Sequence, residues 1–337
     1  MNYSNISRNH PYNEILLVPY SFKVVLSFVS SVAMLVSAIG NILVITSFVK
    51  TLSLRNSTNS YITSMAVSDL LFVAVDLALY ASSRLFVLGG SVSSFQCKFG
   101  RYIANVSYSV SIESLVLITV DRYIAIVYPM KVILITGKMR TAFILASWII
   151  PMGMLAPFLH YYKRAQELDG PLICTMGSKL LHAVYTFMGI VLLFIIPLIV
   201  IVILNSRIMK ALRTTTQGVP NPNLSNSARR HQQNRKIIKT LIAINVIFFA
   251  CWTLYYLSII FFVFFGHVLR RDSQEMLVIT CLYLPALLST VANPAILFIF
   301  SKNYRQALKN CFRSVVVKCR SCLARQEVTG LQSTDLN

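Results

Sequence analysis

The sequence predicts an all-α membrane protein, a bundle of seven transmembrane helices followed by a short amphipathic eighth helix. Of its 337 residues, 56% are hydrophobic and 12% are charged, and the mean hydropathy is +0.66. A soluble domain carries about 25% charged residues, so this composition indicates several membrane spans. Apolar segments of about 20 residues recur along the chain, and each can cross a hydrocarbon layer of roughly 30 Å.

Lysine and arginine residues are concentrated on one predicted side of the membrane. The net charge is +20, and with the amino terminus outside, 21 of the 31 Lys and Arg residues fall on the inner side. Cytoplasmic loops are enriched in these residues, which also attract the anionic lipids of the inner leaflet. The basicity therefore reflects topology and needs no nucleic-acid partner. We expect a multi-pass plasma-membrane protein with a cytoplasmic carboxyl terminus.

Residues 1–21 are expected to form an extracellular tail. They are polar and mixed, so no cleavable signal peptide is expected and the first span must direct insertion. Asn2 and Asn5 each begin a glycosylation sequon, which is consistent with an exported tail. Asn56 also begins a sequon, but it falls on the inner side and should stay unmodified.

The first two spans, residues 22–49 and 61–88, each carry a polar residue at mid-depth. Asn41 follows Gly40 in the first span. Lipid offers no hydrogen-bond partner, so the asparagine needs one inside the bundle, unless the pair is only a small-residue packing notch. Asp69 lies in the second span, where a carboxylate needs a proton, a cation or strong hydrogen bonds.

The third span ends in Asp121-Arg122-Tyr123, followed by Ile-Ala-Ile-Val-Tyr-Pro-Met-Lys. The apolar run before this cluster contains formal charges only at Arg101 and Glu113. Isolated charges at membrane depth are costly, so an ion-paired acid and base at the end of a span is a candidate functional group. The alternative is a charge pair that only anchors the helix at the interface.

This string closely resembles the third-helix signature of rhodopsin-like (class A) G-protein-coupled receptors. The later spans carry the family's markers in order: Trp148 (141–159), Pro197 (180–204), Cys251-Trp252 (237–265) and Asn293-Pro294 (276–300). The resemblance covers residues 22–313. It implies a seven-helix bundle over residues 22–300 that binds an extracellular ligand, preferentially a neuropeptide, and activates a heterotrimeric G protein.

The resemblance also assigns roles to individual residues. Cys97 and Cys174 are both expected outside the cell and should form the family's disulfide. The G-protein coupling switch is Asp121, Arg122 and Tyr123, and the activation network is Asn41, Phe248, Trp252, Asn293 and Pro294. In the family, Gly-Asn at the position of Asn41 joins a polar network with the second span.

No cofactor is required, but the resemblance implies sodium as an allosteric ion. Its oxygen ligands would be Asp69, Ser111, Ser289 and Asn293. Hard oxygen ligands suit such an ion. The alternative is a protonated, structural Asp69.

The ligand pocket is expected to be aromatic and uncharged at depth. Its candidates are Tyr80, Ala104, Tyr108, Trp252, Tyr255, Tyr256 and Tyr283. Ala104 stands where receptors for amines need an aspartate, and no lysine occurs between Lys239 and Lys302 to hold retinal. A basic outer rim would steer an anionic or amidated peptide, or is ordinary solvated loop charge.

Three positions depart from the family pattern. Leu254 replaces the sixth-span proline, Leu297 replaces the seventh-span tyrosine, and Asn205 replaces a tyrosine at the inner end of the fifth span. Asn234 lies where some relatives place an acid opposite Arg122. The hypothesis is that Arg122 pairs chiefly with Asp121 and that the resting state is less locked than usual.

The inner regions are expected to be loop, surface helix and tail. Met209 to Gln233 is predicted to be the third inner loop, because Thr214 to Ser227 has linker composition. Its basic flanks are either a partner surface or membrane-facing charge. Residues 301–313 should form an amphipathic membrane-surface helix, and 314–337 a disordered cytoplasmic tail. Palmitoylation candidates are Cys311, Cys319 and Cys322.

The sequence also bears on functions other than that of a receptor. No phosphate loop, clustered metal ligands or nucleophile–base pair points to an enzyme. A small transporter or channel would show a charged path or internal repeats, whereas the buried acids besides Asp121 are only Asp69, Asp76 and Glu113. A receptor for a lipid or small apolar ligand, or one with weak or no G-protein coupling, stays open. Arrestin, receptor kinases and membrane lipids are the further partners that the resemblance implies.

Overall fold

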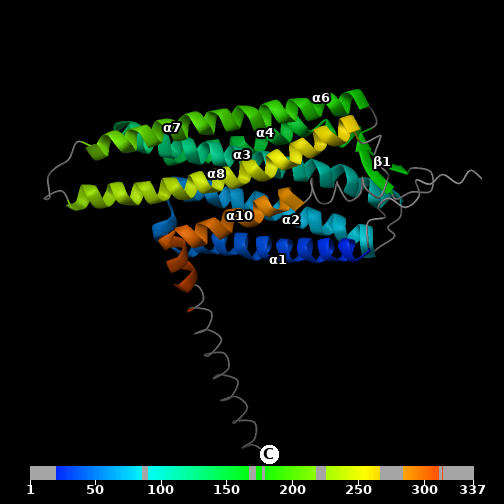
Figure 1. Cartoon of the computed structure of the whole chain (residues 1–337), viewed down its shortest axis with the longest axis horizontal. Helices are drawn as coiled ribbons and strands as arrows, with labels where there is room; N and C mark the ends of the chain where they lie inside the picture. The colour runs from blue at the N-terminus through cyan, green and yellow to red at the C-terminus, as the bar shows by residue number, and fades with distance from the viewer. Residues whose placement is uncertain are drawn as a thin grey trace, which may run out of the picture.

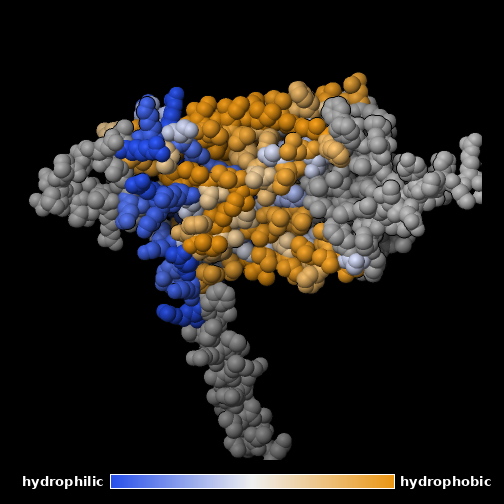
Figure 2. Space-filling view, in the orientation of Figure 1, coloured by the Kyte–Doolittle hydropathy of each residue, from blue (hydrophilic) through white to orange (hydrophobic). Residues whose placement is uncertain are grey.

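The computed structural model describes residues 20–85, 90–166, 172–176, 179–217, 225–265, 284–310 and 313. Helices dominate this part of the chain and run side by side along the long axis of the molecule (Figure 1). Hydrophobic residues cover the body of the bundle on the face shown in Figure 2, and hydrophilic residues gather at one end. This distribution suits a protein with an apolar belt in lipid and a polar end in water.

The first half of the chain forms four long helices, α1 (Tyr20–Lys50), α2 (Ser57–Leu85), α3 (Gly90–Val127) and α4 (Gly137–Leu155). Short 3₁₀ turns at Leu52–Leu54 and Pro129–Leu134 connect α1 to α2 and α3 to α4. Thr136 caps α4, because its hydroxyl accepts a hydrogen bond from the Met139 backbone N–H at 3.3 Å. A one-turn helix, α5 (Phe158–Tyr161), follows α4.

The second half contributes α6 (Lys179–Ile190), α7 (Ile196–Gln217), α8 (Ser225–Phe265) and α10 (Leu284–Phe300). A π-helical turn at Val191–Ile195 joins α6 to α7 just before Pro197, where the sequence predicts a kink. Such a wide turn accommodates a residue that lacks a backbone N–H. Helix Lys302–Asn310 follows α10 at a bend of 92°.

Five helical segments in the described ranges are long and apolar enough to cross a membrane, and the bent pair of α10 and Lys302–Asn310 would add a sixth. α3 is not among them. It packs against α2, α4 and α7, and it buries four serines, Ser107, Ser109, Ser111 and Ser114. A helix surrounded by other helices needs little lipid-facing apolar surface, so these serines suit its central place in the bundle.

The predicted third inner loop, Met209–Gln233, is wrong for most of its length. α7 continues to Gln217 and α8 begins at Ser225, so only residues 218–224 lie outside the two helices and outside the described residues. The polar composition favours a linker in isolation. A helix that has already formed in the bundle extends readily, however, because each added residue closes one further hydrogen bond.

A β-hairpin is the one pair of strands in the described ranges, and no sequence pattern predicts it. β1 (Tyr162–Gln166) pairs antiparallel with β2 (Leu172–Met176), and the register sets Arg164 opposite Cys174. Cys97 of α3 is buried and disulfide-bonded. The Cys174 side chain lies outside the described residues, so the pairing of these two cysteines stays a prediction.

Candidate functional site

An aromatic cluster joins α3 to α8. The Tyr108 ring of α3 lies 3.6 Å from the Trp252 ring of α8, centroid to centroid, and 6.3 Å from the Phe248 ring. The Tyr256 hydroxyl donates a hydrogen bond to the Tyr108 hydroxyl at 3.0 Å. All four side chains are buried. Three pocket candidates therefore belong to one packed unit.

The spacing of the α8 aromatics explains the cluster. Phe248, Trp252 and Tyr256 lie four residues apart, so a single helical face presents all three to α3. Tyr255 packs edge-on against Trp252 with centroids 4.9 Å apart. The Trp252 Nε1–H has no hydrogen-bond partner in the described part of the chain. Since buried indole N–H groups usually have a partner, a bound ligand could accept from this one.

The other predicted pocket residues are less well placed by the structure. Ala104, one turn from Tyr108 on α3, is half-buried and packs on the same core. The Tyr80 side chain and residue Tyr283 lie outside the described part of the molecule. Their contact with a ligand stays a prediction.

Below the aromatic cluster, Asp69 of α2 is held by two other helices. Its Oδ1 accepts a hydrogen bond from Ser111 Oγ of α3, and its Oδ2 accepts one from Asn293 Nδ2 of α10, each at 2.9 Å. Ser111 Oγ also shares a hydrogen bond of 2.8 Å with Ser68 Oγ. Asp69 is only 3% exposed. These bonds offset part of the cost of burying a carboxyl group in the bundle.

The oxygens around Asp69 fit a small hard cation in part. Asn293 Oδ1 is buried and has no hydrogen-bond partner among the described residues, so one neutral acceptor is free beside the carboxyl group. Ser289 is also buried, but its Oγ donates to the Ala286 carbonyl of its own helix at 2.6 Å. No group of three or more His, Cys, Asp or Glu residues in the described ranges forms a metal cluster. One carboxylate and neutral oxygens would therefore hold any ion here.

The polar network of Asn41 runs to α10. Asn41 Nδ2 donates to the Ser37 carbonyl at 2.9 Å and to the Thr290 carbonyl at 3.2 Å. These bonds join the first span to the seventh, and the network with the second span that the family resemblance implies stays a prediction. Gly40 explains the approach, because a Cβ built there would lie 2.8 Å from Pro294 Cγ.

The acid and base at the end of α3 form an ion pair. Arg122 Nη2 lies 2.8 Å from Asp121 Oδ2. Thr58 of α2 donates a hydrogen bond of 2.7 Å to the same oxygen, so a neighbouring helix positions the carboxylate. This is the pairing hypothesised for Arg122. The Asn234 side chain lies outside the described residues.

Tyr123, the third residue of the predicted switch, faces α7. Its hydroxyl accepts a hydrogen bond from Arg207 Nη1 at 3.5 Å. The Tyr123 and Tyr128 rings meet edge to face with centroids 5.7 Å apart. The switch thus contacts α2 through Asp121 and α7 through Tyr123.

The three departures from the family pattern occupy different environments. Leu254 is 56% exposed on the outer face of α8, and Leu297 is 3% exposed within the core. Asn205 lines a cavity between α7 and α8. Without the sixth-span proline, α8 is a continuous helix of 41 residues.

Sequence reasoning missed the residues that support these sites from other helices. Thr58 lies 63 residues from Asp121. Ser64 of α2 accepts a hydrogen bond of 3.0 Å from Trp148 Nε1 of α4. Serine and threonine are common on α2, and nothing in their local sequence distinguishes the ones that bind another helix. Cys251 of α8 is half-buried and free.

Several predicted modification sites fall outside the described residues. These are Asn2, Asn5, Cys311, Cys319 and Cys322. Glycosylation and palmitoylation therefore stay predictions.

Comparison with known proteins identifies relatives over most of the chain. A family model described as "7 transmembrane receptor (rhodopsin family)" matches residues 40–297. A galanin receptor 2a from Danio rerio is 27% identical over 300 residues, covering 86% of this chain and 78% of the relative. A QRFP-like peptide receptor from Branchiostoma floridae is 29% identical, covering 83% and 75%. A substance-K receptor from Canis lupus familiaris is 27% identical, covering 84% and 73%.

Proposed function

The chain belongs to the rhodopsin family of seven-transmembrane receptors, and from that premise we propose that it is a peptide receptor coupled to a heterotrimeric G protein. It is therefore a multi-pass membrane protein, and a receptor rather than an enzyme. The names of the relatives support a peptide ligand, since they include galanin, QRFP-like peptide and substance-K receptors. The same proposal includes an extracellular amino terminus and binding to arrestin, receptor kinases and membrane lipids.

The observation that carries the proposal is that α3 contributes to all three clusters. Tyr108 contacts the aromatic face of α8, Ser111 binds Asp69, and Arg122 pairs with Asp121. The 14 residues from Tyr108 to Arg122 span roughly 21 Å along the helix. A change in the packing of α3 against α8 at one end is therefore transmitted to the ion pair by a continuous helix.

The mechanism is a difference in binding energy between two arrangements of the bundle. A ligand that contacts Tyr108 and the free indole N–H of Trp252 would compete with the Tyr256–Tyr108 hydrogen bond. Loss of that bond would loosen α8 from α3 and favour its outward movement. Arg122 would then be free to contact the G protein, and peptide and G protein would strengthen each other's binding reciprocally.

Sodium is proposed as an allosteric ion of the resting bundle. Asp69, Ser111 and Asn293 would supply a carboxylate, a hydroxyl and the unpartnered amide oxygen, and Ser289 would add a second hydroxyl by rotating away from Ala286. Bound there, the ion would supply a positive charge that links α2, α3 and α10. Peptide affinity should then fall as sodium rises in the wild type and should not respond in Asp69→Asn.

The test of the function is ligand-free G-protein activation in cells that express wild type or Arg122→Ala at equal surface density. Basal signal that is lost in Arg122→Ala establishes coupling, and the same cells can then be screened with a peptide library. A peptide that binds at the surface without any signal would favour a non-coupling receptor. A response confined to lipids or small apolar compounds would contradict the peptide assignment.

A further inference from the structure

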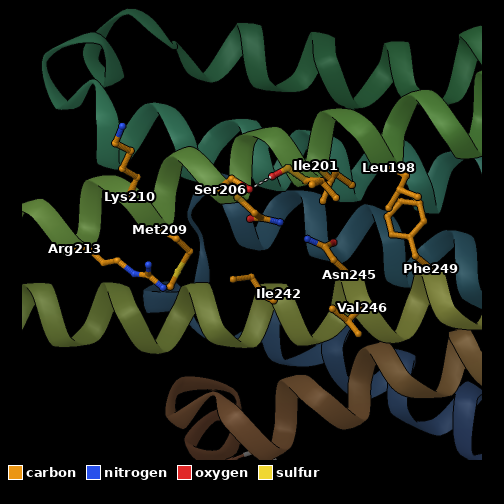
Figure 3. Close-up of a pocket in the computed structure, with 12 residues that line it drawn as sticks. Leu198, Ile201, Ser206, Met209, Lys210, Arg213, Ile242, Asn245, Val246 and Phe249 are labelled. Atoms are coloured by element: carbon orange, nitrogen blue, oxygen red, sulfur yellow. Dashed lines mark hydrogen bonds between the residues drawn. The ribbon is translucent and has the colours of Figure 1, made fainter.

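A groove between α7 and α8 is not used by the mechanism above. It has a volume of about 730 Å³ and is lined by residues of α7 from Leu198 to Arg213 and of α8 from Ile242 to Phe249. Val202 and Val246 on its walls are 53% and 61% exposed. In a bundle surrounded by lipid these side chains face the acyl chains, so the groove opens to the membrane (Figure 3).

The groove contains a buried polar side chain without a partner. Asn245 extends from α8 into the gap between the two helices (Figure 3) and is 5% exposed. Neither its Nδ2 nor its Oδ1 has a hydrogen-bond partner in the part of the chain that the structure describes. Because an unpaired buried amide is costly, and because hydrocarbon cannot pair with it, the groove suits an occupant that carries hydrogen-bonding groups.

One end of the groove is positively charged. Arg213 lies in the gap between α7 and α8 at that end, and Lys210 lies one turn before it (Figure 3). The same end of the molecule is the hydrophilic end in Figure 2. The sequence has no Asp or Glu between Asp169 and Asp272, so neither helix can supply a carboxylate to Arg213.

The length of the groove along α7 exceeds the thickness of the headgroup region of a bilayer. From Asn205 to Arg213, α7 advances eight residues, roughly 12 Å. Each headgroup region of a bilayer is roughly 5–7 Å thick. The charged Arg213 is expected in the headgroup region, because a charge in the hydrocarbon is costly. The groove therefore extends from the headgroup region at Arg213 into the hydrocarbon at Asn205.

We propose that this groove binds an anionic phospholipid of the leaflet at the basic end. The phosphate contacts Arg213, with Lys210 adding positive charge, and an ester carbonyl of the lipid accepts a hydrogen bond from Asn245 Nδ2. One acyl chain lies against Val202 and Val246. Because the lipid contacts both α7 and α8, it holds the two helices together at the end where a G protein would bind.

The test uses purified full-length protein in phosphatidylcholine nanodiscs that contain a small fraction of phosphatidylserine with a diazirine on one acyl chain. After irradiation, labelled peptides are identified by mass spectrometry, and α1 peptides serve as the reference for general lipid contact. We expect labelling of 198–213 and 242–249 well above that of α1. The same probe on phosphatidylcholine should label the two ranges no more than α1.

Variants separate the headgroup contact, the buried amide and the groove itself. Arg213→Ala should reduce groove labelling by about fivefold, the value expected for one basic residue near an anionic surface. Asn245→Leu should reduce it as well, and Ser206→Trp, which fills the groove from its exposed wall, should abolish the excess over α1. Lys239→Ala removes an exposed base of α8 that does not line the groove and should leave labelling unchanged.

Three results would overturn the proposal. Equal labelling of the groove by both probes would mean that the headgroup is not recognised. Labelling that does not exceed α1 would mean that only bulk lipid touches these helices. Excess labelling over α1 that persists in Ser206→Trp would mean that the labelled lipid does not lie in the groove.

Discussion

Gly40 lies where α1 and α10 approach each other closely. A Cβ there would lie 2.8 Å from Pro294 Cγ and 3.0 Å from Pro294 Cβ, closer than ordinary contact. The proline ring is rigid, so α1 or α10 would have to shift. The same shift would lengthen the Asn41 hydrogen bond to the Thr290 carbonyl.

We therefore expect Gly40→Ala to destabilise the bundle by about 1–3 kcal/mol, the usual cost of overpacking a tight site. The measurement is the thermal unfolding midpoint of the detergent-solubilised protein. Gly153→Ala is the matched control, because a Cβ at that helical position meets nothing within 4 Å. A lower midpoint for Gly153→Ala than for Gly40→Ala would show that the contact with Pro294 does not limit stability.

Thr58 is the second residue that merits a test, because it orients the acid that restrains Arg122. Its hydroxyl donates a hydrogen bond of 2.7 Å to Asp121 Oδ2, the oxygen that also binds the Arg122 guanidinium. Hydrogen bonds to charged groups contribute about 1.5–3 kcal/mol. Thr58→Val removes this bond and keeps the side-chain shape.

With the carboxylate less firmly held, the resting arrangement loses stability relative to the active one. Thr58→Val should therefore raise ligand-free G-protein activation by roughly tenfold, the equivalent of about 1.4 kcal/mol and the low end of that range. Thr63→Val is the control, since that hydroxyl donates only to the Asn59 carbonyl of its own helix. Unchanged or lower basal activity in Thr58→Val, at equal surface expression, would mean that Asp121 needs no help from α2.

At the scale of elements, the reliability of the sequence prediction depended on how far apart the interacting groups are. The Asp121–Arg122 pair is adjacent in the sequence, and the α8 aromatics repeat every four residues, so both follow from local geometry. The partners of Asp121 and Asp69 come from other helices. Only a family resemblance could propose Ser111 and Asn293, and nothing proposed Thr58.

The ends of α7 and α8 were mispredicted for a different physical reason. Composition describes how a segment behaves alone, whereas these segments extend helices that the bundle already stabilises. The β-hairpin was missed because its strands are five residues each and carry no strong alternation of polar and apolar residues. Local patterns are weak for such short elements.

The inner ends of α7 and α10 carry the two positions where tyrosines are missing. Asn205 lines the open groove beside α8, and Leu297 is packed in the core. A tyrosine at 205 has space in the groove, whereas one at 297 must displace neighbours until α8 moves. The double variant Asn205→Tyr/Leu297→Tyr should therefore favour the arrangement in which α8 has moved outward.

We expect that variant to change basal and ligand-stimulated G-protein activation several-fold relative to wild type, and neither single variant to reproduce the full effect. Concentration–response curves for all four proteins, at equal surface expression, measure the coupling between the two positions. Additive effects of the single variants would show that the two side chains do not act together.

At the scale of the whole molecule, the distribution of charge argues for one orientation. Hydrophilic residues gather at the end of the molecule where α7 ends and α8 begins (Figure 2). The basic residues of α7 and α8 at that end, which include Arg207 and Lys239, have no acidic residue on their own helices to offset them. Segments rich in Lys and Arg stay in the cytoplasm during insertion, so this end should be inside and residues 1–21 outside.

Glycosylation tests that orientation, because the modifying enzyme acts only on the exported side. Glycosidase treatment should lower the apparent mass of wild type, and Asn2→Gln/Asn5→Gln should already run at the lower mass. Asn56 begins another sequon in the turn between α1 and α2, next to the Leu52–Leu54 turn, at the basic end. Asn56→Gln should run like wild type. A glycan that is lost in Asn56→Gln and kept in the double variant would place the basic end outside, and with it the Arg122 switch, where no G protein could reach it.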